Sequence, residues 1–100
     1  MTADNILSYL HSNTALLKKC KVKKIGLFGS YAKGCQSQDS DIDFLVEYLP
    51  GQKSFDNFMY LIDHLEAGLN KNVEVVTAES VSDSFLNHIR PDLKYVQIDY

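Results

Sequence analysis

The sequence predicts an α+β fold in which a small mixed β-sheet is backed by helices. Short runs rich in β-branched and aromatic residues indicate strands, and segments with apolar residues at three- and four-residue spacing indicate helices. These elements follow one another in the order helix, strand, strand, helix, strand, helix, which is typical of a sheet with helices packed against it. With 100 residues, the chain is expected to form one domain over residues 1–100.

The first half of the chain predicts a helical region followed by two strands. Thr2 and Asn13 are placed to cap two helical segments ahead of a lysine-rich stretch. Residues 22–28 (VKKIGLF) indicate the first strand, and residues 30–34 suit a tight turn into a short helix. After a polar loop, residues 42–48 (IDFLVEY) indicate a second strand, which we expect to be central in the sheet.

The second half predicts a long helix, a third strand and a mixed tail. Ser54 is placed to cap the helix, and residues 72–77 (NVEVVT) indicate the strand. The tail over residues 79–100 predicts a short helix, a break at Pro91 and a last helix or strand around residues 95–98. Apolar residues of the long helix are expected to form one buried stripe, made of Phe55, Phe58, Met59, Ile62, Leu65 and Leu69.

Composition indicates a folded chain and excludes several classes of protein. Hydrophobic residues make up 45% of the sequence and charged residues 23%, as in ordinary globular proteins. A formal net charge of -3 argues against nucleic acid as the main partner. Cys20 and Cys35 match neither a disulfide framework nor a zinc motif, and no apolar run is long enough for a membrane span. We therefore expect a cytoplasmic protein with reduced thiols and no membrane partner.

Asp41 and Asp43 are the first candidate site residues. They stand at the start of the second strand with one residue between them, so both carboxylates face the same side of the sheet. Such a pair can bind two divalent ions in phosphoryl transfer, and oxygen ligands favour Mg²⁺ or Mn²⁺. Ile42, Phe44 and Val46 on the opposite face would hold the strand in the core. The alternative is a pair of solvated aspartates with no chemical role.

Gly29 and Ser30 form a candidate phosphate-binding turn directly after the first strand. Glycine allows a backbone turn that a side chain would block, and a following helix N-terminus would direct amide hydrogens at an anion. Lys33 lies on the same segment and could meet a triphosphate oxygen, while Gly34 closes the turn. The alternative is an ordinary turn with a surface lysine. The candidate metal-binding pair Asp41 and Asp43 favours a phosphate-binding turn.

Glu74 is the third acidic candidate. It stands in the apolar run over residues 73–76, where burying an unpaired carboxylate would be costly unless a metal or a proton transfer compensates. If the third strand lies beside the second, Glu74 joins Asp41 and Asp43 as a metal ligand or as a proton acceptor. The alternative is a position on the solvent face of an edge strand.

The stretch over residues 29–46, GSYAKGCQSQDSDIDFLV, resembles the signature of the minimal nucleotidyltransferases (MNT) of the DNA polymerase beta superfamily. In that signature Gly-Ser is followed by ten residues and then Asp-x-Asp, and ten residues, 31–40, separate the two motifs here. The resemblance implies a polymerase beta palm-like nucleotidyltransferase fold and a metal-dependent transfer of a nucleoside monophosphate from a nucleoside triphosphate to a hydroxyl. It implies phosphate binding by Gly29 and Ser30, two magnesium ions on Asp41 and Asp43, and a third carboxylate at Glu74, where the family often has aspartate.

Larger members of the superfamily add domains that hold the acceptor, and this chain is expected to lack them. The resemblance therefore points to free-standing members, which are similar to antitoxins encoded beside HEPN toxins. It implies transfer of AMP from ATP to a tyrosine of a HEPN-family toxin. Two alternatives stay open: an inactive binding module that neutralises its partner by occlusion, and an enzyme that modifies a small molecule such as an antibiotic. A homo-oligomer is compatible with each.

Overall fold

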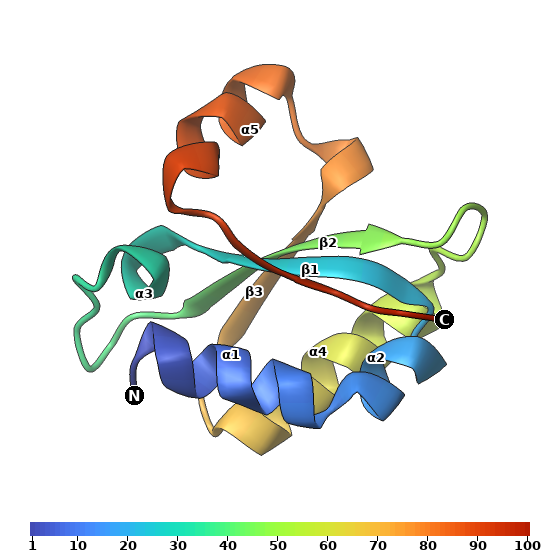
Figure 1. The fold of residues 1–100 in the computed structure, drawn as a ribbon, viewed down its shortest axis with the longest axis horizontal. Coiled ribbons are helices and arrows are strands. Elements are labelled where there is room, and N and C mark those ends of the chain that lie inside the picture. Colours follow the sequence, from blue (N-terminus) through green and yellow to red (C-terminus); the bar gives the residue numbers. More distant parts are fainter.

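A four-stranded mixed sheet forms the centre of the computed structural model, which describes all 100 residues (Figure 1). Its strands are β1 (Val22–Phe28), β2 (Ile42–Tyr48), β3 (Val73–Thr77) and β4 (Lys94–Gln97). The strand order is β3-β2-β1-β4, with β1 antiparallel to both β2 and β4 and β2 parallel to β3. The predicted α+β class and the central place of the second strand are confirmed, and the tail ends in a strand rather than a helix.

Three helices cover one face of the sheet and enclose the main core. They are α1 (Ala3–Ser12), α2 (Thr14–Lys19) and α4 (Phe55–Leu69), which lie together on the lower side of the sheet in Figure 1. Ile42, Phe44 and Val46 of β2 are all fully buried against these helices. Because side chains alternate along a strand, the residues between them face the opposite side. The predicted anchoring of the second strand is therefore confirmed.

The opposite face carries a smaller layer built around helix α5 (Asp83–Ile89). This helix stands above the sheet in Figure 1 and lies between the 3-10 turns η1 (Ala78–Ser80) and η2 (Arg90–Asp92). A second apolar cluster joins the buried residues Phe28, Leu45 and Ile89 on this face. The helix therefore covers part of the face on which the alternate residues of β2 project.

Two of the three predicted helix caps are confirmed, and one is wrong. Thr2 forms a capping box with Asn5 at the start of α1, and the Ser54 hydroxyl caps α4. Asn13 makes no side-chain cap for α2. Its amide instead donates to the backbone carbonyl of Tyr9 at 2.7 Å, so it satisfies the C-terminal end of α1.

The buried stripe of α4 agrees with the predicted one at Leu65 and Leu69, but it also includes Leu61, which was not predicted. Leu61, Leu65 and Leu69 are buried at four-residue spacing and form the row that faces the sheet. Phe55 is 77% exposed and Met59 37% exposed. These two residues also lie four apart, but their row is rotated away from the leucine row. Apolar spacing alone allowed either row, and the packing against the sheet selects the leucines.

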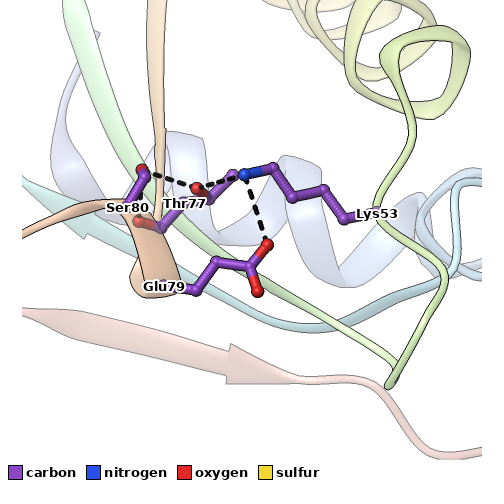
Figure 2. A network of polar contacts seen from close by, with 4 residues as sticks. All are labelled: Lys53, Thr77, Glu79 and Ser80. Carbon is purple, nitrogen blue, oxygen red and sulfur yellow. Dashed lines mark hydrogen bonds and ion pairs between the residues drawn. The ribbon is translucent and has the colours of Figure 1, made fainter.

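A polar network fixes the end of β3 to the loop before α4 (Figure 2). The Thr77 hydroxyl is buried, accepts a hydrogen bond from Lys53 Nζ at 3.3 Å and donates to Ser80 Oγ at 2.6 Å. Lys53 Nζ also lies 3.2 Å from a carboxylate oxygen of Glu79. The network thus satisfies the only polar residue among the buried ones, at the end of β3 opposite Glu74.

Both cysteines are free thiols, Cys20 buried and Cys35 exposed. None of the helices combines the length and apolar character that a membrane span requires.

Candidate active site

The predicted carboxylates gather at the edge of the sheet where β2 and β3 begin. Asp43 pairs in register with Glu74 on β3 and with Phe28 on β1. Residues paired across neighbouring strands point to the same face, so the carboxylates of Asp43 and Glu74 project side by side on the face that α5 partly covers. Asp41 precedes β2 by one residue and lies on the same side by the alternation of the strand. The structure therefore brings the three predicted acidic residues together.

Asp43 has a pKa of about 6, well above the ordinary value of an aspartate. Burial of its carboxyl group is the main cause, followed by the neighbouring charge of Glu74, a proton shared with that carboxylate, and the charge of Asp41. Asp43 is half-buried, whereas the other two acids are exposed. The site therefore concentrates negative charge that a bound cation would relieve.

The donor set suits a hard divalent ion such as Mg²⁺, because every candidate ligand is a carboxylate. As the side chains stand, however, no group of three or more acidic, histidine or cysteine side chains is gathered so that it could hold a metal ion. The carboxylates are neighbours and would have to turn toward a common point when an ion binds. The chemistry of the residues fits a metal, and the binding site is not fully preformed.

Gly29 brings the backbone of the next segment directly against Asp43. Its φ of +74° lies in the left-handed region, and a Cβ atom at this position would overlap the Asp43 carboxylate. Both facts require glycine here. The turn opens the short helix α3 (Gly29–Lys33), whose first-turn amides, including that of Ser30, have no partner within the helix. Amide donors for an anion and carboxylates for a cation thus lie next to each other.

Lys33 lies in the last turn of α3, and its side chain is exposed. Together with Gly29 it lines a cavity of ≈ 180 Å³ whose other walls come from Phe28 at the end of β1 and from α5 and η2. From these elements His88 and Asp92 reach the cavity, and neither was predicted to be a site residue. They lie far from the Gly-Ser turn along the chain, and no spacing in the sequence marks them. Only the fold shows that the C-terminal region adjoins the predicted site.

The reasoning that led to Glu74 is wrong in one respect. Glu74 is exposed, so it bears no burial penalty that a metal or proton would need to offset. β3 is an edge strand, as the alternative interpretation held, yet its register with β2 still places Glu74 beside Asp43. The position next to the aspartates, and not the apolar surroundings, is what makes this carboxylate a candidate.

Comparisons with known proteins agree with this geometry. A family model described as Polymerase beta, Nucleotidyltransferase matches residues 6–96. A Methanocaldococcus jannaschii protein named as a candidate protein adenylyltransferase is 40% identical over 98 residues, covering 95% of this chain and 98% of its own length.

Two solved structures share the fold. The structure of a candidate minimal nucleotidyltransferase superposes with a TM-score of 0.80 at 21% identity, covering 94% of this chain and 95% of the other, and it confirms the fold that the resemblance implied. A toxin–antitoxin structure with AMP-PNP has a TM-score of 0.64 at 27% identity, covering 83% of this chain and 71% of the other. With nearly its whole length matched by the family model, the chain belongs to the Polymerase beta, Nucleotidyltransferase family.

Proposed function

We propose that this chain is a protein adenylyltransferase that moves AMP from ATP to a hydroxyl group of a protein. The observation that carries the proposal is the pairing of Asp43 with Glu74 directly beside the Gly29 turn. Carboxylates that concentrate negative charge, next to a turn with unpaired amides, suit a triphosphate accompanied by divalent ions. The name of the M. jannaschii relative supports this choice of reaction, and the AMP-PNP in the toxin–antitoxin structure supports ATP as donor.

In this proposal, Asp41 and Asp43 hold two Mg²⁺ ions, for which Mn²⁺ could substitute, and Glu74 is the third carboxylate. The bound ions would supply positive charge that polarises the α-phosphate and stabilises the departing pyrophosphate. The amides of the Gly29 turn and the Ser30 hydroxyl bind the β- and γ-phosphates. Lys33 at the end of α3 adds a positive charge to the same phosphates.

Glu74 is suited to accept the proton of the attacking hydroxyl. It is the exposed carboxylate on the edge strand, where an incoming acceptor can approach, whereas Asp43 is half-buried behind it. The acceptor oxygen forms a bond to the α-phosphorus, and the bond from that phosphorus to the β-phosphate oxygen breaks. Pyrophosphate leaves, and the hydroxyl proton passes to the Glu74 carboxylate.

The acceptor in this proposal is a tyrosine of a HEPN-family toxin. Asp41 and Glu74 are exposed, and Glu74 lies on an edge strand of the sheet. An acceptor that presents its own surface to this edge, as a folded protein does, suits the site better than a small molecule that needs enclosure. The structural neighbour with AMP-PNP is a toxin–antitoxin pair, and this supports a toxin as the partner.

The test is to incubate the chain with α-labelled ATP, Mg²⁺ and a HEPN-family protein encoded next to it, and to follow label on the partner. Asp41→Asn is expected to abolish transfer, and Glu74→Gln to slow it about a hundredfold or more. Asp39→Asn is the matched control, because this exposed carboxylate lies in the same loop two residues from Asp41 and is expected to keep full activity. Label transfer that survives Asp41→Asn would overturn the proposed role of the aspartates.

A further inference from the structure

The outer edge of β3 presents backbone groups that no strand of the chain uses. β3 is the last strand on its side of the sheet, so nothing pairs with the groups that face away from β2. The N–H of Ile42 donates to the carbonyl of Asn72 at 3.0 Å, so the backbone groups of Asn72 and of every second residue after it face β2. Those of Val73, Val75 and Thr77 therefore face outward.

Side chains of the protein itself close both ends of this outer edge. The N–H of Val73 donates to a carboxylate oxygen of Glu66 on α4 at 3.0 Å. The carbonyl of Thr77 accepts a hydrogen bond from Ser80 Oγ at 3.0 Å, and both residues belong to the network of Figure 2. The N–H and C=O of Val75 and the N–H of Thr77 lie between these closed ends. An edge that is closed at its ends and open in its middle suits one short strand in a fixed register.

A largely apolar groove of ≈ 420 Å³ borders the open part of the edge. Phe55 and Phe58 of α4 line it on one side, and Val75, Val76 and Thr77 line it on the other. Side chains of consecutive strand residues point to opposite faces, so a groove that Val75 and Val76 both line opens at the edge between the faces. Ligand sites have volumes of about 300 to 1,000 Å³, so the groove has room for a bulky side chain. Phe55 is 77% exposed, which leaves an aromatic ring of the groove uncovered.

The region around the groove is acidic. Residues 53–80, which include α4 and β3, contain five acidic residues and two lysines, whereas acidic and basic residues are equal in number in the rest of the chain. The formal net charge of -3 therefore resides in this region. Its two lysines are already engaged, since Lys53 pairs with Glu79 and Lys71 Nζ donates to the carbonyl of Gln38. A segment that carries basic residues beside an apolar side chain therefore complements this edge.

We propose that the acceptor protein binds as a fifth strand on the outer edge of β3 and places a bulky apolar side chain in the groove beside Phe55. The inference rests on the proposed function and deepens it, because it names the surface that recognises the acceptor. Side chains alternate along the added strand, so the residue next to the apolar one projects on the face that carries Glu74. Neighbouring strands lie about 4.8 Å apart, and a tyrosine at that position extends toward the carboxylates. The recognised segment is therefore a tyrosine next to a bulky apolar residue, with Lys or Arg on its flanks.

The first test measures binding and AMP transfer with the HEPN-family protein encoded next to this chain. Phe55→Ser is expected to weaken binding of that protein at least tenfold by calorimetry, as truncation of an aromatic anchor does. It should raise the KM for the acceptor by a similar factor and leave kcat and ATP binding unchanged, because Phe55 lies outside the carboxylate site. Tyr95→Ser is the matched control and should change none of these quantities, since it removes a 47% exposed ring from β4 at the opposite edge of the sheet.

A second pair of variants tests the charge. Asp56→Asn, which removes an exposed carboxylate next to Phe55 in the first turn of α4, is expected to weaken binding about twofold to fivefold and to reduce its dependence on salt. Asp83→Asn removes the corresponding first-turn carboxylate of α5 and should leave binding unchanged. Equal effects of the two substitutions would show that charge does not direct the docking.

Amide hydrogen exchange tests the addition of a strand directly. Exchange at Val75 and Thr77 is expected to slow at least tenfold when the HEPN-family protein is bound, because their N–H groups then donate to the added strand. Exchange along β4 should not change. Contacts made through side chains alone would leave the rates at Val75 and Thr77 unchanged.

Three results would overturn the docking site and leave the proposed function standing. They are AMP transfer with a KM that Phe55→Ser does not change, partner binding without slower exchange at Val75, and a dimer of this chain that Phe55→Ser disrupts while the partner still binds. The last result would assign the edge to self-association. A partner that binds and slows exchange at Val75 but receives no AMP would overturn the proposed function alone, and the absence of any binding would overturn both.

Discussion

Asp43→Asn is expected to stabilise the metal-free protein while removing its activity. The raised pKa of Asp43, about 6 against 3.8, means that its charged form is disfavoured in the folded state. A difference of about 2 pKa units corresponds to about 3 kcal/mol for a fully buried group. Because Asp43 is half-buried and therefore partly screened by solvent, we expect about 1 to 1.5 kcal/mol. That gain would raise the Tm by about 5 to 10 °C in a domain of this size.

The pH dependence has a definite sign. An acid whose pKa is raised by folding binds its proton more tightly in the folded than in the unfolded protein, so the stability of the unchanged chain falls as pH rises from about 3.8 to about 6. Above that pH window the cost of keeping Asp43 charged in the folded protein is fully present, and below it this cost is absent. The advantage of Asp43→Asn should therefore be complete at pH 8 and should vanish below about pH 4.

The assay is urea unfolding of both proteins in EDTA at several pH values, with Asp39→Asn as the control for loss of one exposed negative charge. Added Mg²⁺ should stabilise the unchanged chain and have less effect on Asp43→Asn, because a ligand that binds only the folded state raises its stability. An Asp43→Asn protein no more stable than the unchanged chain at pH 8, or an advantage independent of pH, would refute the reasoning.

Substitutions in three regions outside the candidate site test the packing by thermal or urea unfolding. In an open helix, Gly68→Ala would increase stability by about 1 kcal/mol. Here it should destabilise the protein, because the new Cβ overlaps the Tyr9 ring. In a Tyr9→Ala background this loss of stability should disappear, and its persistence would count against the contact. Thr77→Val should lose about 1 kcal/mol by breaking the buried network of Figure 2, and an unchanged stability would show that the network contributes nothing. Leu61→Ala should lower the free energy of unfolding by about 2 to 5 kcal/mol and Phe55→Ala by less than about 0.5 kcal/mol. The reverse order would support the buried stripe that the spacing predicted.

The sequence was sufficient for those parts of the fold that depend on local patterns. The bounds of β1 and β2 agree with the predicted runs over residues 22–28 and 42–48, because alternating apolar residues and flanking turn residues act within a few positions. The predicted buried stripe of α4 was partly wrong, because Phe55 is exposed and Leu61 is buried. Both are apolar, and what separates them is which side of the helix meets the sheet. That choice depends on the angle at which the helix packs, which a local pattern does not contain.

The candidate site was likewise predicted from the sequence only in part. The spacing of Gly29 and Asp41 is a local feature, and the resemblance that it carries pointed to the family that the comparisons show. The partnership of Asp43 with Glu74 depended on a strand pairing that the sequence left conditional. The wall that Asp92 contributes was not predicted at all, because it depends on the path of the chain after β3.

Strand direction explains why groups for an anion and for a cation meet at one edge of the sheet. β2 and β3 are parallel, so Asp43 and Glu74 near their beginnings lie at the same edge, and β1 is antiparallel to β2, so its end at Gly29 arrives there too. Val75, buried against the helices, fixes the face on which its neighbour projects. A one-residue slip of β3 would bury Glu74 and expose Val75, so the packing of the core holds the third carboxylate in place. The hydrophobic face of β3 thus maintains the site. Because side chains alternate along this five-residue strand, the same register that packs the core also positions Glu74.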